Sequence, residues 1–187
     1  MSKTKVPSRW IKTAADEQAV RDGCYFDDSA ADHVCVFFEK FLCLSKGQWA
    51  GKPFQLMDWQ RNEILKPLFG WRLKDGRRRF RTGYVEIPKK NGKSGLASGL
   101  SLYLLLADGE PGAEVYSVAA DRAQASIVFN ESAQMVKSSP HLSKRLEVID
   151  SRKTIASPLN TGTFRALAAD SDSNEGLNVH GLIFDEL

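Results

Sequence analysis

Cysteine is scarce in this sequence of 187 residues. The three cysteines, Cys24, Cys35 and Cys43, are odd in number, lack C-x-x-C spacing and all lie in the first quarter of the chain. This pattern is typical of reduced thiols in a cytosolic protein. The sequence therefore argues against a fold held together by disulfides and against a zinc site.

Long apolar segments are also missing. Residues 1–18 are basic but contain no apolar stretch of the kind that a secretory signal needs. The longest apolar stretch, residues 96–107, is interrupted by Ser98, Gly99 and Ser101 and is shorter than the roughly 20 residues that span a bilayer. We expect a soluble protein inside a cell, with no membrane partner.

A strong net charge is absent as well. The 26 Lys and Arg residues nearly balance the 23 Asp and Glu residues, and the net charge of +3 argues neither for nor against a nucleic-acid partner. One local run of basic residues, 77–81, reads RRRFR. It could contact DNA phosphates, but a solvated hairpin or a contact between subunits is the more common role of such a run.

What the sequence does contain is an ordinary globular composition, with 42% hydrophobic residues, in a length that suits one well-buried core. Apolar spacing predicts helices at residues 31–44, 58–68, 93–107 and 121–137. Stretches that favour extended structure predict strands at residues 82–88, 113–119, 153–157, 163–168 and 181–187. Strands that alternate with helices predict an α/β fold with a largely parallel sheet flanked by helices. We expect an N-terminal helical extension over residues 1–50 and the α/β domain over residues 51–187.

The segment PKKNGKS, residues 88–94, has the context of a phosphate-binding loop, because it follows a predicted strand and opens a predicted helix. Unpaired backbone N–H groups and the helix dipole favour an anion at such a position. Gly92 allows the main chain to approach phosphates, Lys93 can reach the β and γ phosphates, and the hydroxyl of Ser94 can bind Mg²⁺. The residues predicted to bind the nucleotide here are Pro88, Lys89, Lys90, Asn91, Gly92, Lys93 and Ser94.

The loop departs from the usual G-x-x-x-x-G-K-[ST] pattern at one position. Ile87 stands where the first glycine is expected. The motif is weaker for this reason, and the start of an ordinary surface helix is the alternative interpretation.

A second motif lies at the end of the chain, where the apolar residues 181–184 run into Asp185 and Glu186. A buried strand that ends in two carboxylates is typical of a Walker B element, which brings the acids to the carboxyl edge of the sheet. Asp185 would then hold the Mg²⁺ shell and Glu186 would polarise the attacking water. The alternative is a strand that simply exits into solvent, but together with the phosphate loop the pair predicts nucleotide binding.

Gln60 is the candidate for recognising the base. It lies in the segment PFQLMDWQ, residues 53–60, upstream of the phosphate loop. A glutamine amide can accept a hydrogen bond from adenine N6 and donate one to N7, so Gln60 predicts a preference for ATP. The alternative is that the aromatic residues of this segment merely fix the loop to the core.

Five segments in this order resemble the ATPase domain of the large terminase subunits of HK97-like tailed phages. They are WAGKPFQLMDWQ, LFGW, YVEIPKKNGKS, AEVYSVAADRAQA and GLNVHGLIFDEL, and the resemblance covers the chain from about residue 31 onward. It includes the phosphate loop without its first glycine, which is usual in that family. The resemblance implies the P-loop NTPase fold of the RecA-like, ASCE class.

The family resemblance also implies roles for individual residues. Gln60 would lie at the adenine, Lys93 and Ser94 at the phosphates and Mg²⁺, Asp185 at the metal, and Glu186 would be the catalytic carboxylate. Lys89 matches the basic residue that relatives place within the loop to act on phosphate, although relatives often have Arg there.

The resemblance further implies a DNA-packaging ATPase in the host cytoplasm, encoded by a phage or prophage. Implied partners are double-stranded DNA, the small terminase subunit, the portal protein and further copies in a homo-oligomeric ring. The chain stops at Leu187, one residue after the acidic pair. We therefore expect a chain truncated after Walker B, which binds ATP but hydrolyses it weakly alone.

Two other functions stay open at this level. One is a superfamily 2 helicase-like ATPase fragment, since helicases also use an adenine-side glutamine and a D-E pair, although their phosphate loop typically keeps the glycine that is missing here. The other is a noncatalytic nucleotide-binding fragment.

Overall fold

The computed structural model describes residues 6–88, 90–119, 122–168 and 176–185. The chain forms two compact units, and each combines two segments of the sequence. Unit 1 comprises residues 1–36 and 55–86, and unit 2 comprises residues 37–54 and 87–187. The division of the chain at residue 50 that the sequence suggests stays a prediction. Within the described ranges, no helix is long and apolar enough to cross a membrane.

Unit 1 is mostly helical. Its elements are η1 (Ser8–Trp10), α1 (Ala14–Arg21), β1 (Tyr25–Phe26), the first part of α2 (Asp28–Phe41), the π-helix η3 (Gln60–Leu65), α3 (Lys66–Gly70) and β2 (Trp71–Arg72). The two short strands pair antiparallel, with Phe26 opposite Trp71. Trp10 stacks on Phe26 with 4.5 Å between ring centroids, and Trp71 meets Phe26 edge-on, so aromatic rings form the centre of this unit.

The helix predicted at residues 58–68 is present, but it is not α-helical throughout. Residues 60–65 are wound as a π-helix, in which the N–H of Lys66 reaches the carbonyl of Arg61. Pro67 follows within the next turn and has no N–H to donate. An irregular turn next to a proline is a common way to accommodate the missing hydrogen bond.

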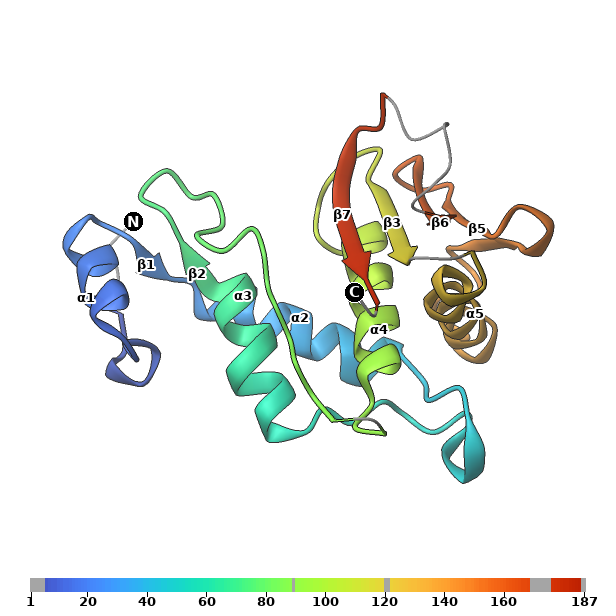
Figure 1. Ribbon diagram of the computed structural model, residues 1–187, viewed down its shortest axis with the longest axis horizontal. Coiled ribbons are helices and arrows are strands. Elements are labelled where there is room, and N and C mark those ends of the chain that lie inside the picture. Colours follow the sequence, from blue (N-terminus) through green and yellow to red (C-terminus); the bar gives the residue numbers. More distant parts are fainter. Residues whose placement is uncertain (1–5, 89, 120–121, 169–175, 186–187) are drawn as a thin grey trace. The chain divides into compact units, whose positions relative to one another are not determined.

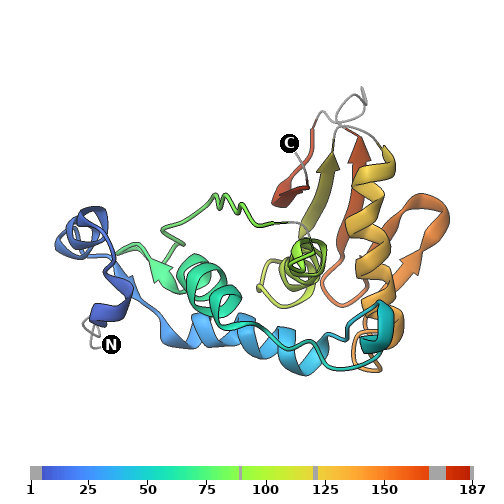
Figure 2. The same ribbon diagram turned by 60° about the horizontal axis from the view of Figure 1, so that its bottom comes forward.

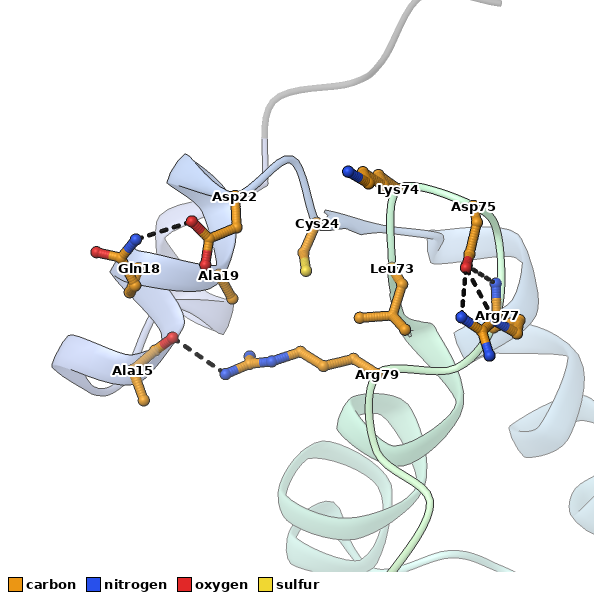
Figure 3. A pocket seen from close by; sticks show the side chains of 10 residues that line it. All are labelled: Ala15, Gln18, Ala19, Asp22, Cys24, Leu73, Lys74, Asp75, Arg77 and Arg79. Carbon is orange, nitrogen blue, oxygen red and sulfur yellow. Dashed lines mark hydrogen bonds and ion pairs between the residues drawn. The ribbon is translucent and has the colours of Figure 1, made fainter.

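Arg79 ties α1 to the hairpin that follows β2. Its guanidinium donates to Asp16 at 2.6 Å and to the carbonyl of Ala15 at 3.2 Å, and it lies 4.6 Å from the centre of the Trp71 ring. Asp16 also completes a capping box with Thr13 at the start of α1. Figure 3 shows Arg79 reaching Ala15 in a hollow of about 570 Å³ between α1 and residues 73–79.

Unit 2 contains a five-stranded sheet in the order β4-β5-β6-β3-β7 (Figure 1). The strands are β3 (Glu114–Ala119), β4 (Glu147–Ile149), β5 (Thr154–Ser157), β6 (Gly162–Ala168) and β7 (Val179–Phe184). β3 pairs parallel with β6 on one side and with β7 on the other. The four strands predicted from residue 113 onward are all present, and β4 is an addition that the sequence did not predict. The expectation that the last strand is buried is wrong, because β7 lies at the edge of the sheet and Leu182 and Phe184 are 43% and 54% exposed.

The sheet is mixed, which corrects the expectation of a largely parallel sheet. β4 pairs antiparallel with β5, and β5 pairs antiparallel with β6. The reason is the length of the connections, since only residues 150–153 and 158–161 lie between these strands. A parallel pair needs a crossover of a dozen or more residues, so such short links allow only hairpins.

Two helices, α4 (Lys93–Leu106) and α5 (Arg122–Ser138), pack against the sheet (Figure 2). Ser117 on β3 donates to the carbonyl of Ala125 in α5, and Gly181 on β7 lies against Leu104 of α4. Both helices agree with the sequence prediction. The predicted start of α5 at Asp121 lies outside the described residues.

Small residues allow α4 to pack closely with its neighbours. Gly99 faces the ring of Phe38 from α2, and a Cβ at this position would lie only 2.3 Å from that ring. Toward α5, the hydroxyl of Ser98 donates to the carbonyl of Val128 at 3.0 Å. These contacts fix α4, whose first turn carries the predicted phosphate loop.

The prediction of a strand at residues 82–88 is wrong. These residues are extended but form no strand, and Tyr84 is 80% exposed. A stretch that favours extended structure becomes a strand only when its backbone pairs with a neighbour, and no backbone hydrogen bond among the described residues pairs this segment. Of the two elements expected to flank the phosphate loop, only the helix is present.

Candidate functional site

The turn before α4 has a backbone shaped for anions. Lys90 and Gly92 both have left-handed conformations, with φ of 69° and 78°, and the side-chain amide of Asn91 donates to the carbonyl of Pro88 at 3.1 Å. A left-handed φ is strained for Lys90 but natural for Gly92. Alternation of this kind turns backbone N–H groups toward a common point. The two left-handed residues are compatible with a phosphate cradle, and the predicted role of the loop stays a prediction.

The N-terminus of α4 is left open at this turn. Gly92 is the N-cap residue, and no side chain in the described part of the chain caps the helix there. The N–H groups of the first helical residues have no partners within the helix, and the dipole places positive potential at the same point. A hollow of about 470 Å³ lies in front of it, lined by Ile87, Pro88, Lys90, Gly92, Lys93, Ser94, Gly95 and Glu131. Five of these eight are residues that the sequence assigned to nucleotide binding.

Lys93 and Asp185, which are 92 positions apart in the sequence, meet at this site. The ammonium of Lys93 lies 3.0 Å from Oδ1 of Asp185. The N–H of Asp185 reaches the carbonyl of Val118, which extends the pairing of β7 with β3 by one residue and places the carboxylate at the carboxyl end of β7. The structure thus brings the two predicted motifs together.

Asp185 is suited to a further ligand. Asp185 is only 8% exposed, and its Oδ1 lies 3.0 Å from the ammonium of Lys93, so the carboxylate is held in place by an ion pair. A buried carboxylate is costly without such a partner, and Lys93 provides one. Mg²⁺ prefers hard oxygen ligands, and Asp185 and the hydroxyl of Ser94 are of this chemical type, so their predicted role as metal ligands stays a prediction.

Gln60 lies in unit 1, at the start of η3, and is only 1% exposed. Its side-chain oxygen accepts a hydrogen bond from the N–H of Met57 at 3.0 Å. The side chain therefore has a local structural role, and its predicted contact with adenine stays a prediction. Lys89 and Glu186, the other two predicted catalytic residues, lie outside the described residues.

The structure also brings to the site a pair that sequence reasoning missed. Glu131 of α5 lines the hollow, and the ammonium of Lys46 lies 2.9 Å from its carboxylate. The two residues are 85 positions apart and belong to no recognised motif. Only the fold could have shown that they meet near the turn before α4.

The basic run at residues 77–81 forms part of a hairpin. Arg77 pairs with Asp75, Arg79 pairs with Asp16, and Arg78 lies over the ring of Phe69. The structure therefore agrees with the more common of the two interpretations, and Arg79 in particular is used within unit 1.

Comparison with known proteins gives one consistent result. A model of the terminase large subunit ATPase domain matches residues 58–187. The large terminase subunit of Enterobacteria phage HK97 is 31% identical over 157 residues, which cover 83% of this chain and 30% of the relative.

The solved structures agree with the sequence comparison. The crystal structure of the HK97 bacteriophage large terminase matches with a TM-score of 0.67 and 27% identity, over 83% of this chain and 31% of that chain. This chain therefore spans about a third of the length of these relatives. The structural match agrees with the predicted P-loop NTPase-like fold. The comparisons do not favour the alternative function of a helicase-like ATPase. The chain belongs to the family of terminase large subunit ATPase domains.

Proposed function

We propose that this chain is the ATP-binding and ATP-hydrolysing motor domain of a phage large terminase, which drives the packaging of DNA into capsids. One observation carries the proposal: the ammonium of Lys93, at the open N-terminus of α4, lies 3.0 Å from Asp185 at the end of β7. A phosphate-binding helix start that faces a carboxylate at the edge of a sheet is the arrangement that phosphoryl transfer from ATP requires.

Each residue of the site has a chemical role in this proposal. The backbone of residues 88–92 cradles the phosphates, Lys93 neutralises their charge, and Ser94 with Asp185 would hold Mg²⁺. A bound Mg²⁺ would stabilise the negative charge that develops on the phosphate oxygens. Glu186 would orient and polarise the attacking water, and Lys89 would act on the phosphates from within the loop.

The contact between Lys93 and Asp185 prepares the site for this chemistry. Lys93 rests against Asp185, so neither charge is left alone in a half-buried site. A phosphate that enters would pair with the ammonium of Lys93 in place of Asp185. The carboxylate of Asp185 would then be available to bind the metal. Binding of the phosphate and binding of Mg²⁺ are thus expected to support each other.

The proposed partners follow from family membership. They are double-stranded DNA as the substrate that is moved, a small terminase subunit, a portal protein and further copies of the large subunit in a ring. The proposed location is the cytoplasm of the infected host. The basic run at residues 77–81 does not support the DNA contact by itself, because Arg77 and Arg79 are paired within unit 1.

Release of phosphate from ATP tests this proposal. The chain should release phosphate only when Mg²⁺ is present, and Lys93→Ala and Glu186→Gln should each reduce the rate by at least about tenfold. Glu186→Gln should leave the affinity for ATP close to its original value, since that residue acts on water rather than on phosphate. Release that persists unchanged in the Lys93→Ala variant would exclude this site as its source.

A further inference from the structure

Glu131 places a negative charge where a phosphate is expected to bind. Its carboxylate lines the hollow in front of the phosphate turn, and its side chain is only 11% exposed. Oε1 lies 3.5 Å from the position that a Cβ on Gly95 would occupy, which puts it beside the first turn of α4. A carboxylate there is favourable for the helix, because it faces the positive end of the dipole.

The same charge is unfavourable for a nucleotide. A triphosphate at the N-terminus of α4 would face a largely buried carboxylate, and like charges at short range in a partly desolvated site repel strongly. The site already holds a second carboxylate, Asp185, but this one is matched by Lys93 at 3.0 Å. Glu131 therefore needs a cation of its own if the hollow is to accept phosphates.

Lys46 is that cation. It lies in the loop between the end of α2 and Phe54. Its Nζ is 2.9 Å from Oε2 of Glu131. The loop is held in place from both sides, because Leu44 pairs with Lys52 and Cys43 bridges to Pro53. The position of Lys46 is thus defined by the fold of unit 2, although its side chain is 70% exposed.

We propose that Lys46 and Glu131 form a second ion pair of the phosphate site, in which Lys46 determines the affinity for polyphosphate by neutralising Glu131. This inference rests on the proposed nucleotide site and adds a specificity-determining pair to it. With both pairs formed, Lys90 leaves a net positive charge among the described residues that line the hollow. Without Lys46, Glu131 cancels that charge.

The proposal differs from a purely structural role for the pair. Lys46 is 70% exposed, and Glu131 also faces the positive end of the α4 dipole, so loss of Lys46 should lower the thermal midpoint less than loss of a buried partner such as Arg79. The affinity for phosphate should change clearly, because one uncompensated charge at a partly solvated site alters binding of a highly charged ligand by about tenfold. The effect should also shrink at high salt.

The test is a set of calorimetric titrations of the whole 187-residue chain with Mg-ATP and with inorganic tripolyphosphate. Lys46→Ala should weaken binding of both ligands by about tenfold. Glu131→Gln should bind at least as tightly as the unaltered chain. The double variant Lys46→Ala with Glu131→Gln should return to within about threefold of the unaltered chain, because the neutral amide at position 131 needs no cation.

A matched control comes from the same loop. Lys52 also carries a positive charge, but its ammonium lies 4.5 Å from the centre of the Trp49 ring instead of on Glu131. Lys52→Ala should leave the affinity unchanged, and Lys46→Arg should retain most of it. These two variants separate pairing with Glu131 from a general loss of positive charge.

Three results would overturn the inference. Unchanged affinity in Lys46→Ala would show that Glu131 does not need this cation, and equally weak binding by the double variant would show that Lys46 acts without Glu131. An effect on Mg-ATP but not on tripolyphosphate would place the effect away from the phosphates. In each case, if Lys93→Ala still abolishes binding, the proposed function survives, whereas an unaltered chain that binds neither ligand contradicts both.

Discussion

Arg79 shows how a single side chain of the basic run contributes to folding. It pairs with Asp16 at 2.6 Å, and both side chains are at most 15% exposed. We predict that Arg79→Ala lowers the free energy of unfolding by about 2 kcal/mol, because it leaves a half-buried carboxylate without its main partner. Arg77→Ala is the control, since Arg77 is 77% exposed and pairs with a residue of its own turn, and it should leave the denaturation midpoint unchanged. Equal midpoints for the two variants would contradict the role given to Arg79.

The ion pair between Arg79 and Asp16 depends on pH, because Asp16 must be ionised. Burial opposes its ionisation, but hydrogen bonds from Arg79, Thr13 and the backbone of Lys12 outweigh burial and hold its pKa below the ordinary 3.8. Because the folded pKa lies below the unfolded one, ionised Asp16 stabilises the chain above pH 3.8, and this contribution is lost as the pH falls through the folded pKa.

We therefore predict that Asp16→Asn loses less stability than the unaltered chain when the pH is lowered from about 5 to about 2. Urea denaturation at a series of pH values measures this difference. Curves of the two proteins that run parallel over the whole range would show that Asp16 does not contribute.

Gln60 combines a structural contact with a predicted functional one. Its oxygen accepts from the N–H of Met57, so Gln60→Ala should cost about 1 kcal/mol of stability. If the amide also reads the edge of adenine, the variant should lose the preference for ATP over GTP that we predict for the unaltered chain. Competition titrations with the two nucleotides measure the preference, and an unaltered chain that binds both equally would remove Gln60 from the site.

Among the elements, α4 carries the strongest constraint on packing. Gly99 faces Phe38 so closely that an added methyl group must displace the ring, whereas a Cβ on Gly95 would meet ordinary contacts at 3.4 Å or more. Both substitutions by alanine gain about 1 kcal/mol of helix propensity. We predict that Gly99→Ala nevertheless destabilises the chain by about 1–3 kcal/mol, while Gly95→Ala does not. Thermal denaturation that ranks the two variants in the opposite order would contradict this packing.

The segment at residues 82–88 offers a direct test of the one predicted strand that the structure lacks. Its residues are largely exposed, and Tyr84 and Val85 have 80% and 40% of their surface accessible. We predict that the backbone amides of residues 82–87 exchange with solvent hydrogen within seconds, whereas those of β3, which is paired on both sides, are protected for far longer. Protection of residues 82–87 comparable to that of β3 would restore the strand.

These elements also show what a sequence can predict. α4, α5 and β3 were found because their apolar patterns and turn signals are local. The antiparallel edge of the sheet and the missing strand at residues 82–88 depend on pairing partners, which local patterns do not contain. At the site, Lys93 and Asp185 were predicted from motifs, but Glu131 and Lys46 meet only through the fold.

At the scale of the whole molecule, the candidate site residues are distributed over both units. The turn before α4, Asp185 at the end of β7 and the Lys46–Glu131 pair all belong to unit 2, whereas Gln60 and the basic run at residues 77–81 belong to unit 1. The family match covers residues 58–187 and thus parts of both units. The central claim of a nucleotide site concerns unit 2, and ligand binding to this unit should stabilise it increasingly as the ligand concentration rises.

Calorimetric titration with Mg-ATP of the unaltered chain and of Lys93→Ala tests this claim most directly. Lys93 faces the hollow at the start of α4 and offers the ammonium that we assign to the phosphates. We predict saturable binding by the unaltered chain, and a loss of affinity of at least about a hundredfold in the variant, since a charge-assisted contact to phosphate is among the strongest that a protein makes. Equal affinities for the two proteins, or no binding by the unaltered chain, would contradict the account.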